Sequence, residues 1–77
     1  MIRVAINGYG RIGRLAHRVI LEKYSSDINV VAINDLTDAT TLAHLFKYDT
    51  AFGIYPGKVV AKKNVIVIDG KEIKILA

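Results

Sequence analysis

Three glycines near the start of the chain have the type and spacing of a phosphate-binding turn. Gly8, Gly10 and Gly13 form the pattern GxGxxG between an apolar, β-branched run and a segment of helical periodicity. In that setting the first glycine permits a tight turn, the second lets the backbone approach a pyrophosphate, and the third lets helix and strand pack closely. The backbone amides of Arg11 and Ile12 would then point at the phosphates, aided by the helix dipole. A turn whose glycines serve packing alone is the alternative.

One carboxylate, Asp35, would complete a dinucleotide site. It directly follows an apolar segment, residues 29–34, about 20 residues after the last glycine, where a carboxylate accepts hydrogen bonds from the adenosine ribose hydroxyls. Such a carboxylate repels a 2′-phosphate, and residues 36–46 contain no Arg to accommodate one, so the sequence favours NAD over NADP. Asp35 could also bond amides where the next helix begins, and both roles can coexist. Asn7 would brace the glycine turn or cap the end of its own strand.

The remaining polar residues indicate neither catalysis nor a metal site. The chain contains no Cys, which excludes disulfides, a zinc–thiolate cluster and a Cys nucleophile. His17 and His44 have no second His or carboxylate at ligand spacing, so we predict no metal. Arg14 and Arg18 are expected to be solvent or interface charges rather than phosphate ligands. The sequence therefore predicts a binding site with no catalytic residue of its own.

Alternating strands and helices would position these groups. Residues 2–7 form a β-branched run that ends against glycine, which predicts a strand, and apolar residues then recur at helical spacing over residues 10–24. Residues 29–34 are nearly all apolar, as expected of a parallel strand buried on both faces. Thr37 can cap a second helix, with Asp38 in its first turn near the positive end of the dipole. The order so far is β-α-β-α.

The last third of the chain predicts further strands. Residues 58–62 and 64–68 alternate in hydropathy, and Asp69-Gly70 is a strong signal for a type I′ hairpin turn. Residues 71–77 would return as a further strand. The sequence stops within this strand or at its end. We therefore predict an α/β fold with a Rossmann-like parallel sheet, built as β-α-β-α followed by a β-hairpin and a third parallel strand, and truncated.

Length and composition bound the possible classes. Seventy-seven residues with 52% hydrophobic and 23% charged residues suit one small domain and exclude a disordered tail. The sequence has no apolar run of membrane-spanning length and no signal peptide, so we expect a cytoplasmic protein without a membrane partner. The net charge of +4 is carried in two separate groups without an aromatic stacking surface, so we expect no nucleic-acid partner.

Beyond these patterns, several segments resemble glyceraldehyde-3-phosphate dehydrogenase. The run Ile-Asn-Gly-Tyr-Gly-Arg-Ile-Gly-Arg resembles the opening of that family, and Val-Ala-Ile-Asn-Asp-Leu is similar to its second strand with the ribose-binding Asp. A helix with its exit loop and a hairpin region are similar too, and the resemblance runs from residue 2 to residue 77. The four segments are residues 6–14, 31–36, 42–50 and 56–74.

The resemblance implies that residues 1–77 are the N-terminal portion of an NAD-binding Rossmann domain. It implies an NAD-dependent enzyme that oxidises glyceraldehyde 3-phosphate with phosphate to 1,3-bisphosphoglycerate, works as a homotetramer, and carries its catalytic domain and catalytic Cys outside this segment. Here Asp35 would orient the ribose, while Gly8, Gly10, Arg11 and Ile12 would hold the pyrophosphate. Erythrose-4-phosphate dehydrogenase and a free-standing nucleotide-binding module are the alternatives.

Two departures from the family stand out. Tyr9 occupies a position where the family usually has Phe, and we expect its hydroxyl to point to solvent. Ala51-Phe52 precede Gly53 where the family usually has a residue followed by His, which would alter the packing of that loop.

Overall fold

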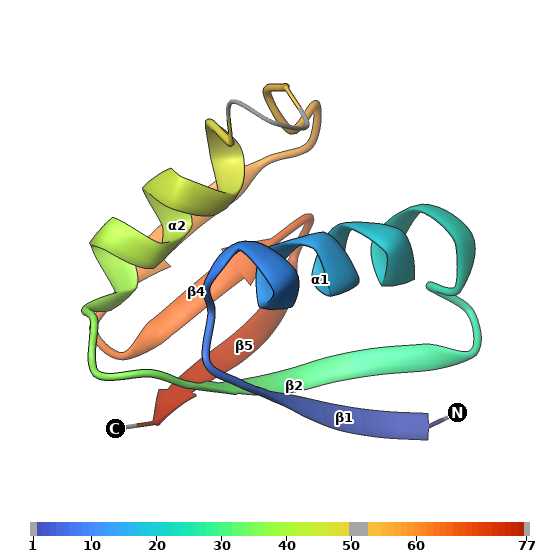
Figure 1. The fold of residues 1–77 in the computed structure, drawn as a ribbon, viewed down its shortest axis with the longest axis horizontal. Coiled ribbons are helices and arrows are strands. Elements are labelled where there is room, and N and C mark those ends of the chain that lie inside the picture. The colour runs from blue at the N-terminus through green and yellow to red at the C-terminus, as the bar shows by residue number, and fades with distance from the viewer. Residues whose placement is uncertain (1, 50–52, 77) are drawn as a thin grey trace.

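A five-stranded sheet with both helices on one face organises residues 2–49 and 53–76, the part of the chain that the computed structural model describes (Figure 1). The loop departure at Ala51-Phe52 lies outside the described residues. The elements are β1 (Ile2–Asn7), α1 (Arg11–Lys23), β2 (Ile28–Asn34), α2 (Ala39–Lys47), β3 (Val59–Lys62), β4 (Val65–Ile68) and β5 (Lys71–Leu76).

The strand order β1-β2-β5-β4-β3 confirms the predicted topology. β1, β2 and β5 are parallel neighbours, with Asn7 opposite Asn34 and Ile33 opposite Ile75. β3 and β4 extend this sheet by antiparallel pairing, so the predicted hairpin makes the sheet mixed. β1 lies at one edge of the sheet. The α/β class, the two helices and the third parallel strand are all as the sequence predicts.

The start of α2 differs from the prediction by one residue. Asp38, not Thr37, is the N-cap, and its carboxylate accepts a hydrogen bond from the Thr41 amide at 2.7 Å. The Thr37 amide instead donates to the side chain of Asp35. The physical reason is spacing: a cap residue bonds the amide two or three positions ahead, and Asp38 stands three residues before Thr41.

Two residues with positive φ close the turn between β4 and β5. Asp69 (φ 50°) and Gly70 (φ 84°) have the left-handed conformations that a type I′ turn requires, which confirms the predicted hairpin. The Asp69 carboxylate accepts hydrogen bonds from the Tyr55 hydroxyl and, at 2.9 Å, from the Lys58 amide. The Tyr55 bond first, and then the Lys58 bond, hold the pKa of Asp69 below its usual range.

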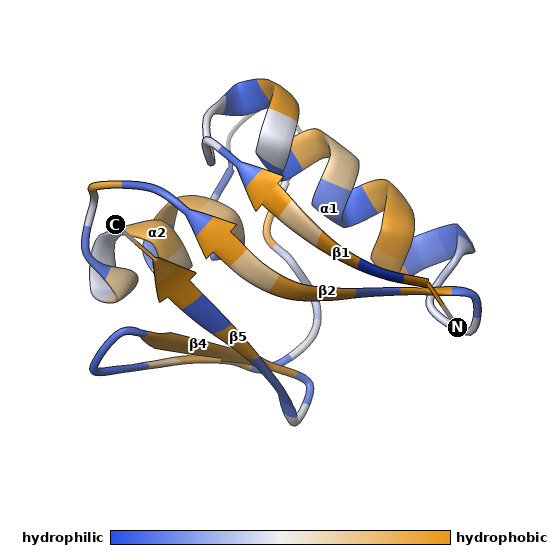
Figure 2. Cartoon of the chain, turned by 90° about the horizontal axis from the view of Figure 1, so that it is seen from below, coloured by the Kyte–Doolittle hydropathy of each residue, from blue (hydrophilic) through white to orange (hydrophobic). Residues whose placement is uncertain are grey.

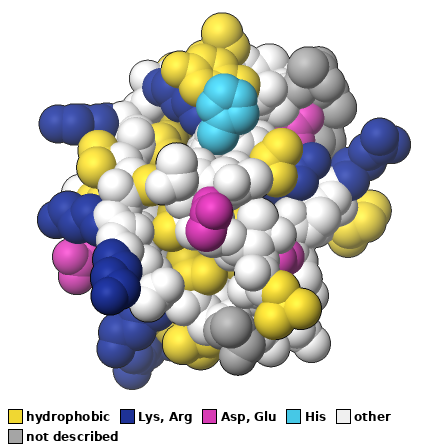
Figure 3. Space-filling model, turned by 90° about the vertical axis from the view of Figure 1, so that its left-hand side faces the viewer, with side chains coloured by type: hydrophobic (Ala, Val, Ile, Leu, Met, Phe, Trp, Pro, Cys, Tyr) yellow, Lys and Arg dark blue, Asp and Glu magenta, His cyan; other side chains and the backbone are white. Residues whose placement is uncertain are grey.

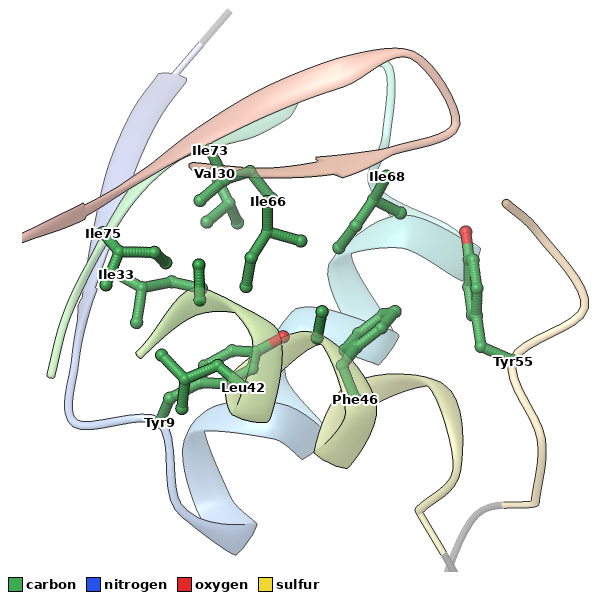
Figure 4. Packing of buried hydrophobic residues seen from close by; sticks show 12 residues of the cluster. Tyr9, Val30, Ile33, Leu42, Phe46, Tyr55, Ile66, Ile68, Ile73 and Ile75 are labelled. Carbon is green, nitrogen blue, oxygen red and sulfur yellow. The ribbon is translucent and has the colours of Figure 1, made fainter. Parts of the chain in front are cut away.

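The core lies between the helices and one face of the sheet. Alternation along the strands places apolar side chains on the inner face. In β5, Ile73 and Ile75 are buried, whereas Glu72 and Lys74, which point to the other face, are exposed. Figure 2 views the chain from below, with the strands in front of the helices. The largest fully buried hydrophobic side chains, all of which are labelled in Figure 4, are Tyr9, Phe46, Ile33, Leu42, Ile66 and Ile68.

Candidate functional site

The glycine turn has the geometry that the spacing predicts. Gly8 has φ +86°, a conformation that side chains disfavour, and it turns the chain out of β1. A Cβ on Gly13 would clash with the carbonyl oxygen of Gly8 and lie 3.1 Å from Cγ2 of Ile6, so α1 packs against the end of β1 at glycine distance. A Cβ on Gly10 would have no neighbour within 4 Å. Packing therefore requires Gly13 but not Gly10, and the backbone at Gly10 faces open space.

The first turn of α1 adjoins that open space. Gly10 is the N-cap, and in the described part of the chain no side chain caps this turn and no acidic residue occupies it. Arg11 and Ile12 are exposed, Ile12 with 76% of its surface. The first amides of a helix lack intrahelical acceptors and carry the positive end of the dipole, so this turn is suited to an anion.

Asp35 lies beside the glycine turn. Its Oδ2 accepts a hydrogen bond from the Tyr9 amide at 2.9 Å, and its Oδ1 accepts one from the Thr37 amide at 2.9 Å. The Thr37 amide first, and then the Tyr9 amide, hold the pKa of Asp35 below its usual range, so the group is a carboxylate at neutral pH. A carboxylate offers about four acceptor positions. Asp35 is only partly buried, so ribose hydroxyls can still reach its oxygens, and the local role and the ribose role are compatible.

Asn7 joins the ends of two parallel strands beneath the turn. Its Oδ1 lies 3.3 Å from Nδ2 of Asn34, which donates to it, and the Gly8 amide donates to the Asn34 carbonyl at 2.8 Å. The Asp35 amide in turn donates to the Leu76 carbonyl at the end of β5, also at 2.8 Å. These bonds align the carboxyl ends of β1, β2 and β5. Asn7, Gly8, Gly10, Arg11, Ile12 and Asp35 therefore gather at one edge of the sheet.

The expectation that the Tyr9 hydroxyl points to solvent is wrong. Tyr9 is 2% exposed, and its hydroxyl lies 2.7 Å from Nδ1 of His17, which is also buried. Figure 4 shows the ring of Tyr9 reaching from the turn into the core beside Leu42 and Phe46. A buried tyrosine needs a hydrogen-bond partner for its hydroxyl, and His17 supplies it. Burial lowers the pKa of His17 to about 4, so the imidazole is neutral, with one donor and one acceptor nitrogen, and its tautomer decides which of the two groups donates in this bond.

The expectation for Arg14 is also wrong, since this side chain braces the turn. Its Nη1 donates to the Tyr9 carbonyl at 3.2 Å, and its Nε donates to Oδ2 of Asp49 at 3.1 Å in an ion pair. Both side chains are mostly buried. Asp49 follows α2, so the pair ties the glycine turn to both helices. No local pattern could have revealed this, because the two partners are far apart in the sequence.

Arg18 likewise is not a solvent charge. It is 6% exposed and donates through Nη2 to the carbonyls of Phe46 at 3.2 Å and Gly53 at 2.7 Å. Its guanidinium lies 5.4 Å from the ring centre of Phe46 and 5.3 Å from that of Tyr55, which are cation–π distances. The group holds the loop after α2 against α1.

Two other kinds of feature are absent from the described residues. Among residues 2–49 and 53–76, no group of three or more His, Cys, Asp or Glu side chains could hold a metal ion. Neither helix of this part of the chain is long and apolar enough to cross a membrane.

The chain runs from a strand through a glycine turn into a helix, and then into a second parallel strand whose terminal carboxylate reaches the turn. This arrangement defines the mononucleotide-binding half of a dinucleotide-binding domain. Figure 3 views the molecule from the side toward which β5 and β2 run in Figure 1. Lys and Arg side chains lie mainly at the margins of this view, and a carboxylate lies near its centre. The fold and the site thus place the chain among nucleotide-binding α/β domains.

Comparison with known proteins identifies the family. Residues 2–77 match the family described as glyceraldehyde 3-phosphate dehydrogenase, NAD binding domain, and the chain belongs to that family. Its cofactor is accordingly NAD, as the sequence predicts. A glyceraldehyde-3-phosphate dehydrogenase of Thermotoga maritima is 61% identical over 77 residues, and one of Clostridium pasteurianum is 57% identical over 77 residues. One of Borreliella burgdorferi is 54% identical over 76 residues.

These relatives are much longer than the chain. The aligned segments cover 99 to 100% of the chain but only 22 to 23% of each relative. The chain therefore spans less than a quarter of the length of these relatives.

Proposed function

We propose that the chain is the N-terminal part of an NAD-dependent, phosphorylating glyceraldehyde-3-phosphate dehydrogenase and holds the ADP half of NAD. The whole enzyme would oxidise glyceraldehyde 3-phosphate, with phosphate, to 1,3-bisphosphoglycerate. It would work as a homotetramer in the cytoplasm, with residues outside this chain binding the aldehyde and the phosphate. The family membership and the high identity to enzymes of that name support this proposal.

A single observation carries the binding role. Oδ2 of Asp35 accepts the amide hydrogen of Tyr9, the residue between the first two glycines of the turn. The acceptor for the ribose and the turn for the pyrophosphate are therefore within one hydrogen bond of each other, as one ADP group requires.

Each residue of the site has a distinct task in this proposal. Gly8 turns the chain, and the backbone at Gly10 lies against the pyrophosphate. The amides of Arg11 and Ile12 donate to the phosphate oxygens, which the positive end of α1 also attracts. Asp35 accepts from the ribose hydroxyls and repels a 2′-phosphate.

Asn7 completes the set by fixing the end of β1 against Asn34 beneath the turn.

The chain's part in the reaction is to bind and orient the cofactor. Bound NAD supplies the hydride acceptor for oxidation of the aldehyde. The chain has no Cys, so the nucleophile that would attack the aldehyde lies outside these residues. We therefore expect the 77 residues alone to have no dehydrogenase activity.

The first experiment is the intact mass of the native gene product, with peptide sequencing past Ala77, followed by NAD titration in a calorimeter and an aldehyde-dependent NADH assay. A product several times longer, with a Cys-containing segment, micromolar or tighter NAD binding and phosphate-dependent activity, would support the proposal. A native product that ends at Ala77 would contradict the enzyme proposal and leave a nucleotide-binding module. A longer product that fails to bind NAD would contradict the cofactor role.

A further inference from the structure

Tyr9 is held more firmly than its place in a glycine-rich turn would suggest. Glycine constrains the backbone least of all residues, so Gly8 and Gly10 on either side leave the turn free to adopt many conformations. Tyr9 is nonetheless fixed at its amide, its carbonyl and its hydroxyl, by Asp35, Arg14 and His17 respectively. A residue with three polar contacts between two glycines restricts a turn that is otherwise flexible.

The side chain of Tyr9 is anchored by two further rings. His17 of α1 lies 5.8 Å from the Tyr9 ring centre in an edge-on arrangement, and Phe46 of α2 lies 6.3 Å away in a stacked one. His17 and Phe46 are themselves 5.0 Å apart. All three side chains are almost fully buried. The anchor thus joins the turn to both helices, and the only polar link within it is the bond between the Tyr9 hydroxyl and His17.

The anchored side chain of Tyr9 also fixes its backbone, which contacts the site. Its amide donates to the carboxylate of Asp35, whose other oxygen is held by Thr37. The direction of the Tyr9 amide therefore helps to fix the orientation of the Asp35 carboxylate. The same peptide segment leads into Gly10 and the first amides of α1. In this way one anchored residue fixes the position of the ribose acceptor, Asp35, relative to the turn that would bind the pyrophosphate.

We infer that Tyr9 and His17 form a buried positioning pair that pre-organises the glycine turn and Asp35 for the ADP half of NAD. The inference rests on the proposed function, because it concerns the same site. It adds that the hydroxyl of Tyr9, at a position where the family usually has Phe, contributes to cofactor affinity in this chain through His17. Neither side chain touches the cofactor in this arrangement, so both act through the turn.

Two variants of the intact native gene product test the pair. Tyr9→Phe removes the hydroxyl and keeps the ring, and His17→Leu removes the hydrogen-bond partner and fills its place with an apolar side chain. Because a net hydrogen bond is worth about 1 kcal/mol, each variant should bind NAD about 3- to 10-fold more weakly. The double variant should lose no more than either single one. Tyr24→Phe is the matched control, since Tyr24 is 45% exposed at the far end of α1, and its affinity should equal that of the wild type.

Two readouts separate positioning from a merely structural role. In steady-state assays Tyr9→Phe should raise the KM for NAD and leave kcat at saturating NAD unchanged, because only binding is affected. In a double-mutant cycle with Asp35→Asn, the effect of Tyr9→Phe on NAD affinity should be smaller than in the wild type, because only the part that acts through the pyrophosphate turn remains.

The outcomes are distinguishable from failure of the proposed function. A wild-type protein that does not bind NAD would overturn the proposed function itself. A wild type that binds NAD, with Tyr9→Phe and His17→Leu within 2-fold of it, would overturn the pair alone. Full additivity with Asp35→Asn would also overturn it, since the two sites would then act independently.

Discussion

Replacing each of the three glycines of the turn by Ala should affect stability and NAD binding in a different way. Gly10→Ala introduces a Cβ with no neighbour within 4 Å at an ordinary φ of −81°. Gly13→Ala introduces one against the Gly8 carbonyl oxygen and 3.1 Å from Cγ2 of Ile6. Gly8→Ala forces a side chain into φ +86°. Only the first replacement leaves the protein without a steric conflict of its own.

The magnitudes follow from these environments. Gly10→Ala should change the free energy of unfolding by less than about 0.5 kcal/mol, as at an open surface position. The same Cβ occupies the side from which a pyrophosphate would approach, and overpacking by one methyl costs about 1–3 kcal/mol. NAD affinity should therefore fall about tenfold or more.

Gly13→Ala should lower stability instead. The clash is with backbone, which cannot rotate away, so α1 must move off β1 at a cost of about 1–3 kcal/mol. The better helix propensity of Ala offsets about 1 kcal/mol of that. Gly8→Ala should cost about 1–2 kcal/mol from the left-handed conformation alone.

Urea unfolding without NAD and calorimetric titration with NAD separate the three variants. Gly10→Ala should unfold like the wild type and bind NAD poorly, whereas Gly8→Ala and Gly13→Ala should unfold at lower urea concentration. Two results would refute the reasoning: a Gly10→Ala protein that binds NAD like the wild type, or one that is destabilised as much as Gly13→Ala in the absence of NAD.

The remaining predictions concern other groups described above. Asp35→Ala should weaken NAD binding about 10- to 100-fold and narrow the preference for NAD over NADP, both measured by calorimetry; unchanged selectivity would contradict the role of the carboxylate. Because burial lowers the pKa of His17 from 6.5 to about 4, the unfolded chain binds more protons between those values, and stability should fall by about 3 kcal/mol as the pH drops from 6.5 to 4. Urea midpoints across that range should show a flatter profile for His17→Leu, and identical profiles would refute this. Asp38→Ala should cost about 1 kcal/mol and speed hydrogen exchange at the start of α2, whereas Thr37→Ala should do neither. The isolated 77-residue chain should self-associate or be partly molten because β1 is a half-exposed edge strand whose outer side has no partner strand among the described residues; a monodisperse monomer in sedimentation with dispersed amide signals would contradict this.

The sequence predicted the elements because each carries a local signal. The β-branched runs of β1 and β2, the periodicity of α1 and the Asp69-Gly70 turn all act over a few neighbouring residues, and the structure contains each of them. The nearness of Asp35 to the glycine turn was also predictable, because the carboxyl ends of parallel neighbours lie at one edge of a sheet.

The polar contacts that hold the site were not predictable in the same way. Arg14 meets Asp49, and Arg18 meets the carbonyls of Phe46 and Gly53, only after α2 has packed beside α1. A charged residue on a helix is usually on its solvated face, so the sequence alone favoured solvent for both.

Tyr9 shows a related limit. A tyrosine in a glycine turn is free to point either way, and its direction depends on whether a buried acceptor lies within reach. His17, eight residues further along the chain in α1, is the buried hydrogen-bond partner of the Tyr9 hydroxyl. No signal in the sequence indicated this contact, because His17 falls on the charged side of the helical pattern and not on its apolar stripe.

The turn between β4 and β5 also bears on how the protein ages. An aspartate followed by glycine is prone to isomerise, because its side-chain carbonyl carbon can be attacked by the next backbone amide nitrogen, and this requires a protonated, freely rotating side chain. In Asp69-Gly70 the carboxylate is held away by the Tyr55 hydroxyl and the Lys58 amide, and the same bonds keep it ionised. The fold thereby protects this linkage, and isoaspartate should accumulate there only when the hairpin opens.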